Sequence, residues 1–77
     1  MKAIEELDVV VLLRALPEFG LTPGDSGTVV HCYGNGKGVE VEFVTGSGNT
    51  VAVVTLEVRD VRLVGEDEIL HVREIAS

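Results

Sequence analysis

Glu40 and Glu42 are the carboxylates in this chain whose spacing could support chemistry. Apolar and acidic residues alternate along 39–43, so a strand would place both glutamates on one face. Two carboxylates on one face could act as a general acid and a general base. The neighbouring sequence implies no pocket around them, and a solvated strand face explains the alternation. We therefore expect both residues to belong to an interaction surface.

The other combinations of reactive side chains indicate no catalytic or metal site. His31 and Cys32 are adjacent, so on a strand they point to opposite faces and cannot easily share a metal ion. A triad of Asp25, Ser26 and His31 would need an arrangement that nothing in the sequence supports. With one cysteine and two histidines, no ligand spacing suggests a zinc site. The sequence thus predicts a protein that is not an enzyme and uses no metal or cofactor.

The glycine-rich segment 34–38 resembles a phosphate-binding loop only in composition. Such a loop opens a helix whose N-terminal amides bind the anion, whereas here a strand with two glutamates comes next. Asn35-Gly36 is instead the dipeptide favoured in tight hairpins, in which both central φ angles are positive. The segment therefore predicts a hairpin turn with positive φ at Gly36.

The balance of charge favours a protein partner over a nucleic acid. Thirteen acidic residues face six basic ones, which gives a formal net charge of -7 at pH 7. Nucleic-acid binders present a basic patch to the phosphates, but only Arg59 and Arg62 lie close together here. Acidic residues cluster near the two ends, at Glu5, Glu6, Asp8, Glu66, Asp67 and Glu68. We expect a partner protein with a basic surface.

Neither export nor membrane insertion is indicated by the sequence. Acidic residues rather than an apolar signal core come after Lys2. The longest apolar run, 9–13, is too short to span a bilayer. The single cysteine, Cys32, forms no disulfide within the chain and is expected to be a small core residue. We expect a cytoplasmic protein without a membrane partner.

Short strands separated by glycine-rich turns are predicted to carry these residues. Pro17, Gly20, Pro23 and Gly24 make the segment after the first strand a long loop, and 57–60 is a brief turn. β-branched and alternating apolar residues predict strands at 9–13, 27–33, 39–43, 50–56 and 61–64. This order predicts an all-β fold, a small SH3-like barrel of about five strands that closes on itself.

The strand pattern also selects the core. We expect five side chains to be largely buried: Val11, Val30, Val41, Phe43 and Leu56. Tyr33, beside the central hairpin, is expected to be partly exposed and joins the candidate interaction surface. A groove that binds proline-rich peptides needs several aromatic residues, and this chain has three in all. Proline-rich peptides are therefore not expected as ligands.

The predicted barrel occupies residues 1–64, and a tail of residues 65–77 extends beyond it. Ile69, Val72 and Ile75 fall at helical spacing, whereas Leu70 and Val72 alternate with polar residues as in a strand. We favour a helix slightly and keep an extended chain as the alternative. The tail adds five residues to the candidate interaction surface: Glu66, Asp67, Glu68, Ile69 and Val72.

The apolar side chains of the tail need cover, because monomers rarely expose a contiguous apolar patch. The tail can fold over an open end of its own barrel, or it can pack against a second copy. A small core favours the second outcome, since association adds buried apolar area. We therefore expect a homodimer formed through the tail, opposed by the high negative charge.

Several blocks of the sequence occur in an order that resembles a known family. These blocks are 7–12, 16–18, 20–21, 24–30 and 39–43. Together they resemble the short bacterial proteins called domain of unknown function 4926, over about residues 7–64. The resemblance implies a small SH3-like barrel and supplies no activity and no catalytic residues. The segment 24–30 is also similar to the loop and strand of KOW domains, which bind RNA or protein, but it lacks their basic residues.

Taken together, these features predict a non-catalytic protein-interaction module. Its concrete form would be an antitoxin- or immunity-like protein that covers a basic protein surface. The alternative is a KOW-like barrel that binds nucleic acid, which the charge disfavours. An enzyme ranks third.

Overall fold

Glycine residues with positive φ divide the chain into its strands. In the first turn, the Asp25 N–H donates to the Thr22 carbonyl at 3.1 Å, and Gly24 has φ of 98°. In the next two turns, Gly36 and Gly48 have φ of 72° and 88°. Side chains rarely tolerate this region, which is why glycine occupies it. The strands on the two sides of each of these turns therefore reverse direction and pair antiparallel.

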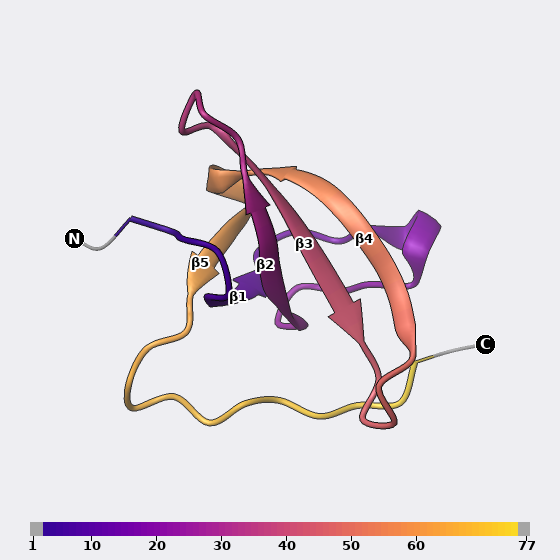
Figure 1. Ribbon diagram of the computed structural model, residues 1–77. Helices are drawn as coiled ribbons and strands as arrows, with labels where there is room; N and C mark the ends of the chain where they lie inside the picture. The colour runs from indigo at the N-terminus through magenta and orange to yellow at the C-terminus, as the bar shows by residue number, and fades with distance from the viewer. Residues whose placement is uncertain (1–2, 76–77) are drawn as a thin grey trace.

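The computed structural model describes residues 3–75, which form one curled antiparallel sheet (Figure 1). Its elements are β1 (Val9–Leu12), η1 (Pro17–Phe19), β2 (Ser26–Cys32), β3 (Gly38–Val44), β4 (Thr50–Glu57), η2 (Val58–Asp60) and β5 (Val61–Leu63). The strands are ordered β4-β3-β2-β1-β5 across the sheet. The predicted all-β, barrel-like fold is confirmed, with its long first loop and its short turn before the last strand. The sheet is open, however, with β4 and β5 as its two edges, so the expected closure is wrong.

The predicted positive φ at Gly36 is confirmed, but Asn35 does not have positive φ, so the turn is not the type in which both central angles are positive. Gly36 is therefore the residue that tests the turn. Replacing Gly36 by valine should destabilise the fold by about 1–2 kcal/mol, because the left-handed region is unfavourable for side chains and most so for β-branched ones. Gly34 lies in the same turn without positive φ, and a Cβ there meets no atom within 4 Å. Urea denaturation should therefore show a larger loss for Gly36→Val than for Gly34→Val. Equal midpoints would contradict the turn assignment.

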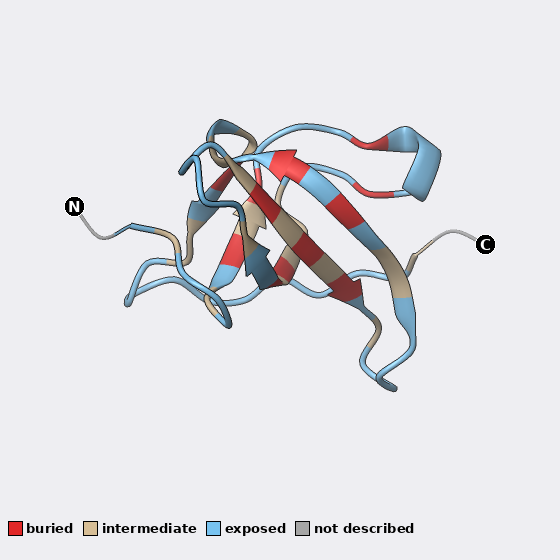
Figure 2. Ribbon diagram, turned by 45° about the horizontal axis from the view of Figure 1, so that its top comes forward, coloured by how far each residue is buried: buried red, intermediate tan, exposed pale blue. Residues whose placement is uncertain are grey.

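Buried residues alternate with less buried ones along the strands (Figure 2), because apolar side chains face the inner side of the curled sheet. The loop between β1 and β2 adds two more, paired through an isolated bridge between Leu16 and Leu21. The buried apolar residues are Val10, Leu12, Leu16, Leu21, Val29, Val39, Val41, Phe43, Val54, Leu56 and Val61. Three predicted core residues, Val41, Phe43 and Leu56, are confirmed.

The other two predicted core residues are not buried. Val11 is half-buried on the outer side of β1, because its neighbours Val10 and Leu12 are the ones that face inward. Val30 is 42% exposed because its neighbour Val29 is the residue that faces inward, so alternation turns Val30 outward. The register of β2 against β3 shifts just beyond it, between Val29 and His31, and such a bulge reverses the face of the residues that follow, so Cys32 rather than His31 faces inward.

The tail is extended, so the slight preference for a helix was wrong. From β5 it runs along one open end of the barrel to the turn between β3 and β4 (Figure 1). An extended chain advances about 3.3 Å per residue and a helix only about 1.5 Å, so a helical tail of this length would stop well short. The helices within residues 3–75 are η1 and η2, and neither is long and apolar enough to cross a membrane.

Candidate interaction surface

The eight residues proposed from the sequence fall into two groups. Tyr33, Glu40 and Glu42 belong to the hairpin of β2 and β3. The other five lie in the tail: Glu66, Asp67, Glu68, Ile69 and Val72. The turn between β2 and β3 and the tail lie at opposite ends of the molecule (Figure 1). The structure therefore divides the predicted surface into two separate surfaces.

The first surface is the solvent side of β2, β3 and β4, called here the outer face. It consists of Thr28, Val30, His31, Tyr33, Glu40, Glu42, Val44, Val53 and Thr55. Strand register places Glu40 between His31 and Thr55. The Glu40 carboxylate accepts hydrogen bonds from the Tyr33 hydroxyl at 3.0 Å and from the Thr55 hydroxyl. The Tyr33 ring also meets the His31 ring edge-on, with centroids 4.8 Å apart.

These contacts fix Tyr33 rather than prepare it for acid–base chemistry. The hydrogen bond to Glu40 raises the pKa of Tyr33 above its ordinary value, because the carboxylate holds the phenolic proton. The phenol therefore stays protonated at neutral pH and acts as a donor. Its ring remains partly exposed, as predicted.

Glu42 occupies the next outward position of β3, between Thr28 and Val53. Its carboxylate accepts a hydrogen bond from the Thr50 hydroxyl at 2.8 Å. Glu40 and Glu42 are thus bound to different hydroxyl groups. This arrangement suits a charged, partly ordered surface rather than a pair of carboxylates that share one reacting group.

Exposed valines surround the two glutamates, and the sequence reasoning missed them. Val30, Val44 and Val53 are all exposed on the outer face. Val53 lies in a run that is apolar on both sides, 51–54, so its local pattern does not reveal which residues face outward. Exposed hydrophobic residues, a tyrosine and nearby charges are typical of protein-binding surfaces.

On the outer face, the hairpin of β3 and β4 carries charges of one sign only. The segment from Gly38 to Glu57, which is β3, its turn and β4, contains three glutamates and no lysine, arginine or histidine. Charges of one sign attract an oppositely charged partner and repel a like-charged one. The charge of this hairpin is therefore complementary to that of a cationic surface.

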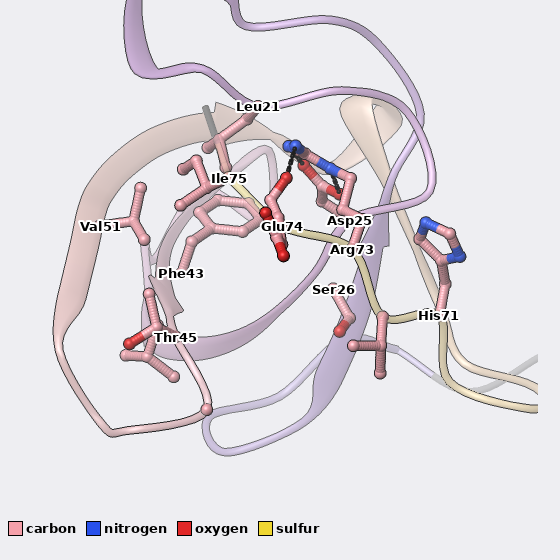
Figure 3. Close-up of a pocket in the computed structure, with 13 residues that line it drawn as sticks. Leu21, Asp25, Ser26, Phe43, Thr45, Val51, His71, Arg73, Glu74 and Ile75 are labelled. Atoms are coloured by element: carbon pink, nitrogen blue, oxygen red, sulfur yellow. Dashed lines mark hydrogen bonds and ion pairs between the residues drawn. The ribbon is translucent and has the colours of Figure 1, made fainter. Parts of the chain in front are cut away.

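The second surface is the tail. Arg73 attaches the tail to the loop before β2 (Figure 3). The guanidinium donates to both carboxylate oxygens of Asp25, at 2.8 and 2.6 Å, and to the Gly20 carbonyl at 2.8 Å. Hydrogen bonding to Arg73 holds the pKa of Asp25 below its ordinary value of 3.8. A bidentate pair of this kind fixes the orientation of both side chains.

Ile75 covers part of the open end of the barrel beside this ion pair (Figure 3). Its side chain lies 3.8 Å from where a Cβ on Gly20 would be. With Leu21, Phe43 and Val51 it lines a shallow cavity of about 500 Å³ between the tail and the sheet. The tail therefore adds apolar cover to Phe43 where the sheet itself ends.

A second ion pair fastens the start of the tail. The Arg62 guanidinium donates to the two oxygens of Glu68 at 2.6 and 2.7 Å, and the Gly65 N–H donates to the same carboxylate at 2.5 Å. Hydrogen bonding from Arg62, with a smaller effect of the Gly65 N–H, lowers the pKa of Glu68 to about 2. Glu68 is therefore committed to an intramolecular contact, whereas Glu66 and Asp67 are exposed in the adjacent turn.

Acid should release the tail. The pKa of Asp25 is lowered in the folded state, so its contribution is complete above 3.8 and is lost as pH falls through the lowered value. We expect the NMR amide signals of Gly20 and Ile75 to be those of the attached tail at pH 5 and to shift to those of the released tail below pH 3.8. Arg73→Gln should shift them already at pH 7, whereas Arg59→Gln, which loses only a pair with Glu57, should not. Unchanged signals in Arg73→Gln would show that this ion pair does not hold the tail.

The end of the tail thus folds back on its own barrel, the outcome that the sequence reasoning ranked second. Its middle remains uncovered, since Ile69 is 96% and Val72 is 89% exposed. A homodimer through these residues stays a prediction.

Comparison with known proteins gives one family. The model of the family described as Domain of unknown function (DUF4926) matches residues 6–63, from the segment before β1 to the end of β5. No curated protein and no solved structure matches the chain significantly. The tail lies beyond the matched residues. Because the match covers the whole sheet and most of its sequence, this chain belongs to the DUF4926 family of domains of unknown function.

Proposed function

We propose that this protein is a non-catalytic interaction module whose outer face binds a basic surface of another protein. The observation that carries the proposal is the composition of that face. An ordered tyrosine and exposed valines lie around two carboxylates, and the hairpin of β3 and β4 that bears these carboxylates has no basic residue. Interfaces combine such an apolar centre with complementary charge on the partner.

The order of Tyr33 supports a binding role for this face. Tyrosine is frequent among residues that contribute most to binding, because it offers a large surface with few rotatable bonds. Here the Glu40 carboxylate and the His31 ring already hold the side chain. Less conformational entropy is then lost when a partner binds.

A small acidic protein of this kind fits an antitoxin or immunity protein, which would neutralise a basic partner by covering it. The net charge of -7 would speed the encounter with such a partner. The same charge would repel nucleic-acid phosphates, so the KOW-like alternative is the weaker proposal.

A charge-reversal experiment tests the proposed face. The double variant Glu40→Lys, Glu42→Lys is compared with Glu66→Lys, Asp67→Lys, which changes the net charge equally but lies in the tail. Capture from cells of the source organism, followed by titration of the purified partner, should give a basic protein bound by wild type and by the tail variant. The outer-face variant should bind it at least tenfold more weakly.

Two results would contradict the proposal. Equal affinity of both double variants would show that the outer face is not the site. Tight, salt-sensitive binding of wild type to a mixed RNA and DNA pool would favour the KOW-like alternative.

A further inference from the structure

β4 is an edge strand of the sheet, and no strand lies beside it on the side away from β3. The strand order places β3 on one side of β4 and nothing on the other. Among residues 3–75, no backbone hydrogen bond joins this free side to another segment. A row of unpaired N–H and C=O groups on an edge strand is a template for another chain.

The hydrogen-bond pattern identifies which residues offer these groups. The Val58 N–H donates to the Lys37 carbonyl at 2.8 Å, in line with the register of β3 and β4. Because bonded and non-bonded pairs alternate in an antiparallel ladder, Val54 and Leu56 also bond toward β3. Val53 and Thr55 then point their N–H and C=O groups away from β3, into solvent.

The middle of the free edge lacks the usual protection, although Glu57 ends β4 and the register of β4 against β3 shifts near Thr50. Proteins normally discourage edge pairing with a proline, or with lysine or another charged residue, on the edge strand. From Thr50 to Leu56, β4 contains no charged residue, no proline and no glycine. The free backbone groups of Val53 and Thr55 therefore lie in a stretch of edge strand that carries no charge and no proline.

The charge beside this edge indicates what would pair with it. Thr55 and Val53, the outward residues of β4, stand directly beside Glu40 and Glu42 of β3. A strand added to β4 would lie about 10 Å from β3, since neighbouring strands are about 4.8 Å apart. Lysine and arginine side chains on its outer side can lean across Val53 and Thr55 to reach the two carboxylates.

We propose that β4 accepts an extended segment of the partner as a sixth strand, with lysine or arginine at alternate positions facing Glu40 and Glu42. This inference rests on the proposed function and gives it a mode of binding. Main-chain hydrogen bonds at Val53 and Thr55 supply affinity, and the alternating charge supplies selectivity. A second copy is a poorer occupant, because it brings the same three glutamates and a net charge of -7 to the same edge.

Three peptides of equal length test the inference on the full chain. The first is Lys-Val-Lys-Thr-Lys-Val-Lys. The second has the same sequence with every backbone nitrogen methylated, so it keeps the charges but cannot donate to a strand. The third has glutamate in place of each lysine. Affinity is measured by fluorescence anisotropy, and amide hydrogen exchange is monitored by NMR.

In the free protein, the amides of Val53 and Thr55 should exchange at least tenfold faster than the amide of Val54. The first peptide should bind and slow exchange at Val53 and Thr55 at least tenfold. The methylated peptide should bind at least tenfold more weakly, and the glutamate peptide should not bind. Val53→Lys should weaken the first peptide at least tenfold, whereas the matched control Val9→Lys, on β1 between two strands, should change its affinity less than twofold.

Failure of this inference is distinguishable from failure of the proposed function. Equal binding of the first two peptides, with Val53 and Thr55 still exchanging freely, would overturn strand addition and leave the acidic outer face as the binding site. No binding of the first peptide, while the captured partner still depends on Glu40 and Glu42, would also overturn strand addition alone. If the first peptide does not bind and the captured partner does not depend on Glu40 and Glu42, both strand addition and the proposed function are overturned.

Discussion

Phe43→Ala should leave the protein mostly unfolded at 25 °C. The ring is 2% exposed and fills the open end of the barrel beneath the tail, beside Leu21, Val51 and Ile75. Removing a buried aromatic ring costs about 3–5 kcal/mol, which combines lost hydrophobic burial with the cavity left behind. A domain of this size has a total stability on the order of 5 kcal/mol, so little would remain.

Circular dichroism during urea denaturation measures this loss, with Phe19→Ala as the control. Phe19 ends the short helix η1 and is 40% exposed, so its removal should cost less than that of Phe43, about 1 kcal/mol. A cooperative transition of Phe43→Ala with a midpoint close to wild type would show that the ring contributes little to the core.

Gly27→Ala is the second change with a large expected effect. An added Cβ would lie 2.6 Å from Val41 Cγ1, 2.9 Å from the Glu42 carbonyl oxygen and 3.0 Å from Phe43 Cδ1. The carbonyl oxygen belongs to the backbone of β3, so it cannot move aside without disturbing the pairing of β2 with β3. Overpacking of this kind costs about 1–3 kcal/mol, and the backbone contact favours the upper end of that range.

The matched control is Gly46→Ala, in the turn between β3 and β4, where an added Cβ meets no atom within 4 Å. The free energies of unfolding from urea denaturation should therefore separate the two alanine variants by about 2 kcal/mol or more. Similar values would mean that β2 and β3 can separate locally at little cost, contrary to the close approach at Gly27.

Local sequence patterns predicted the strands well because turns and alternation are local properties. Asn35-Gly36 fixes a hairpin, and the alternation around Phe43 fixes its inward face. The prediction for Val30 was wrong because Val29 and Val30 are adjacent valines, and the local pattern does not show which of the two faces inward. The predicted burial of Val11 was wrong because the run 9–13 is apolar throughout and contains no signal of which residues face inward.

The candidate surfaces were predictable only in part, for the same reason. Alternation placed Glu40 and Glu42 in solvent on one face, but the contact of Glu40 with Thr55 depends on the register of β3 against β4. The pairing of Arg73 with Asp25 joins residues that are 48 positions apart, and no spacing rule relates them. Long-range contacts of this kind depend on the three-dimensional path of the tail.

The two ion pairs of the tail have a consequence for its effective concentration near the barrel. The contact of Arg62 with Glu68 tethers the start of the tail, so Arg73 searches for Asp25 within a small volume. Exposed ion pairs are individually weak, but tethering makes the second contact intramolecular and so strengthens the attachment of both. Cleavage of the exposed segment 69–72 would remove this advantage. The fragment bearing Arg73 and Ile75 would then be present near the barrel only at its bulk concentration, so it would dissociate.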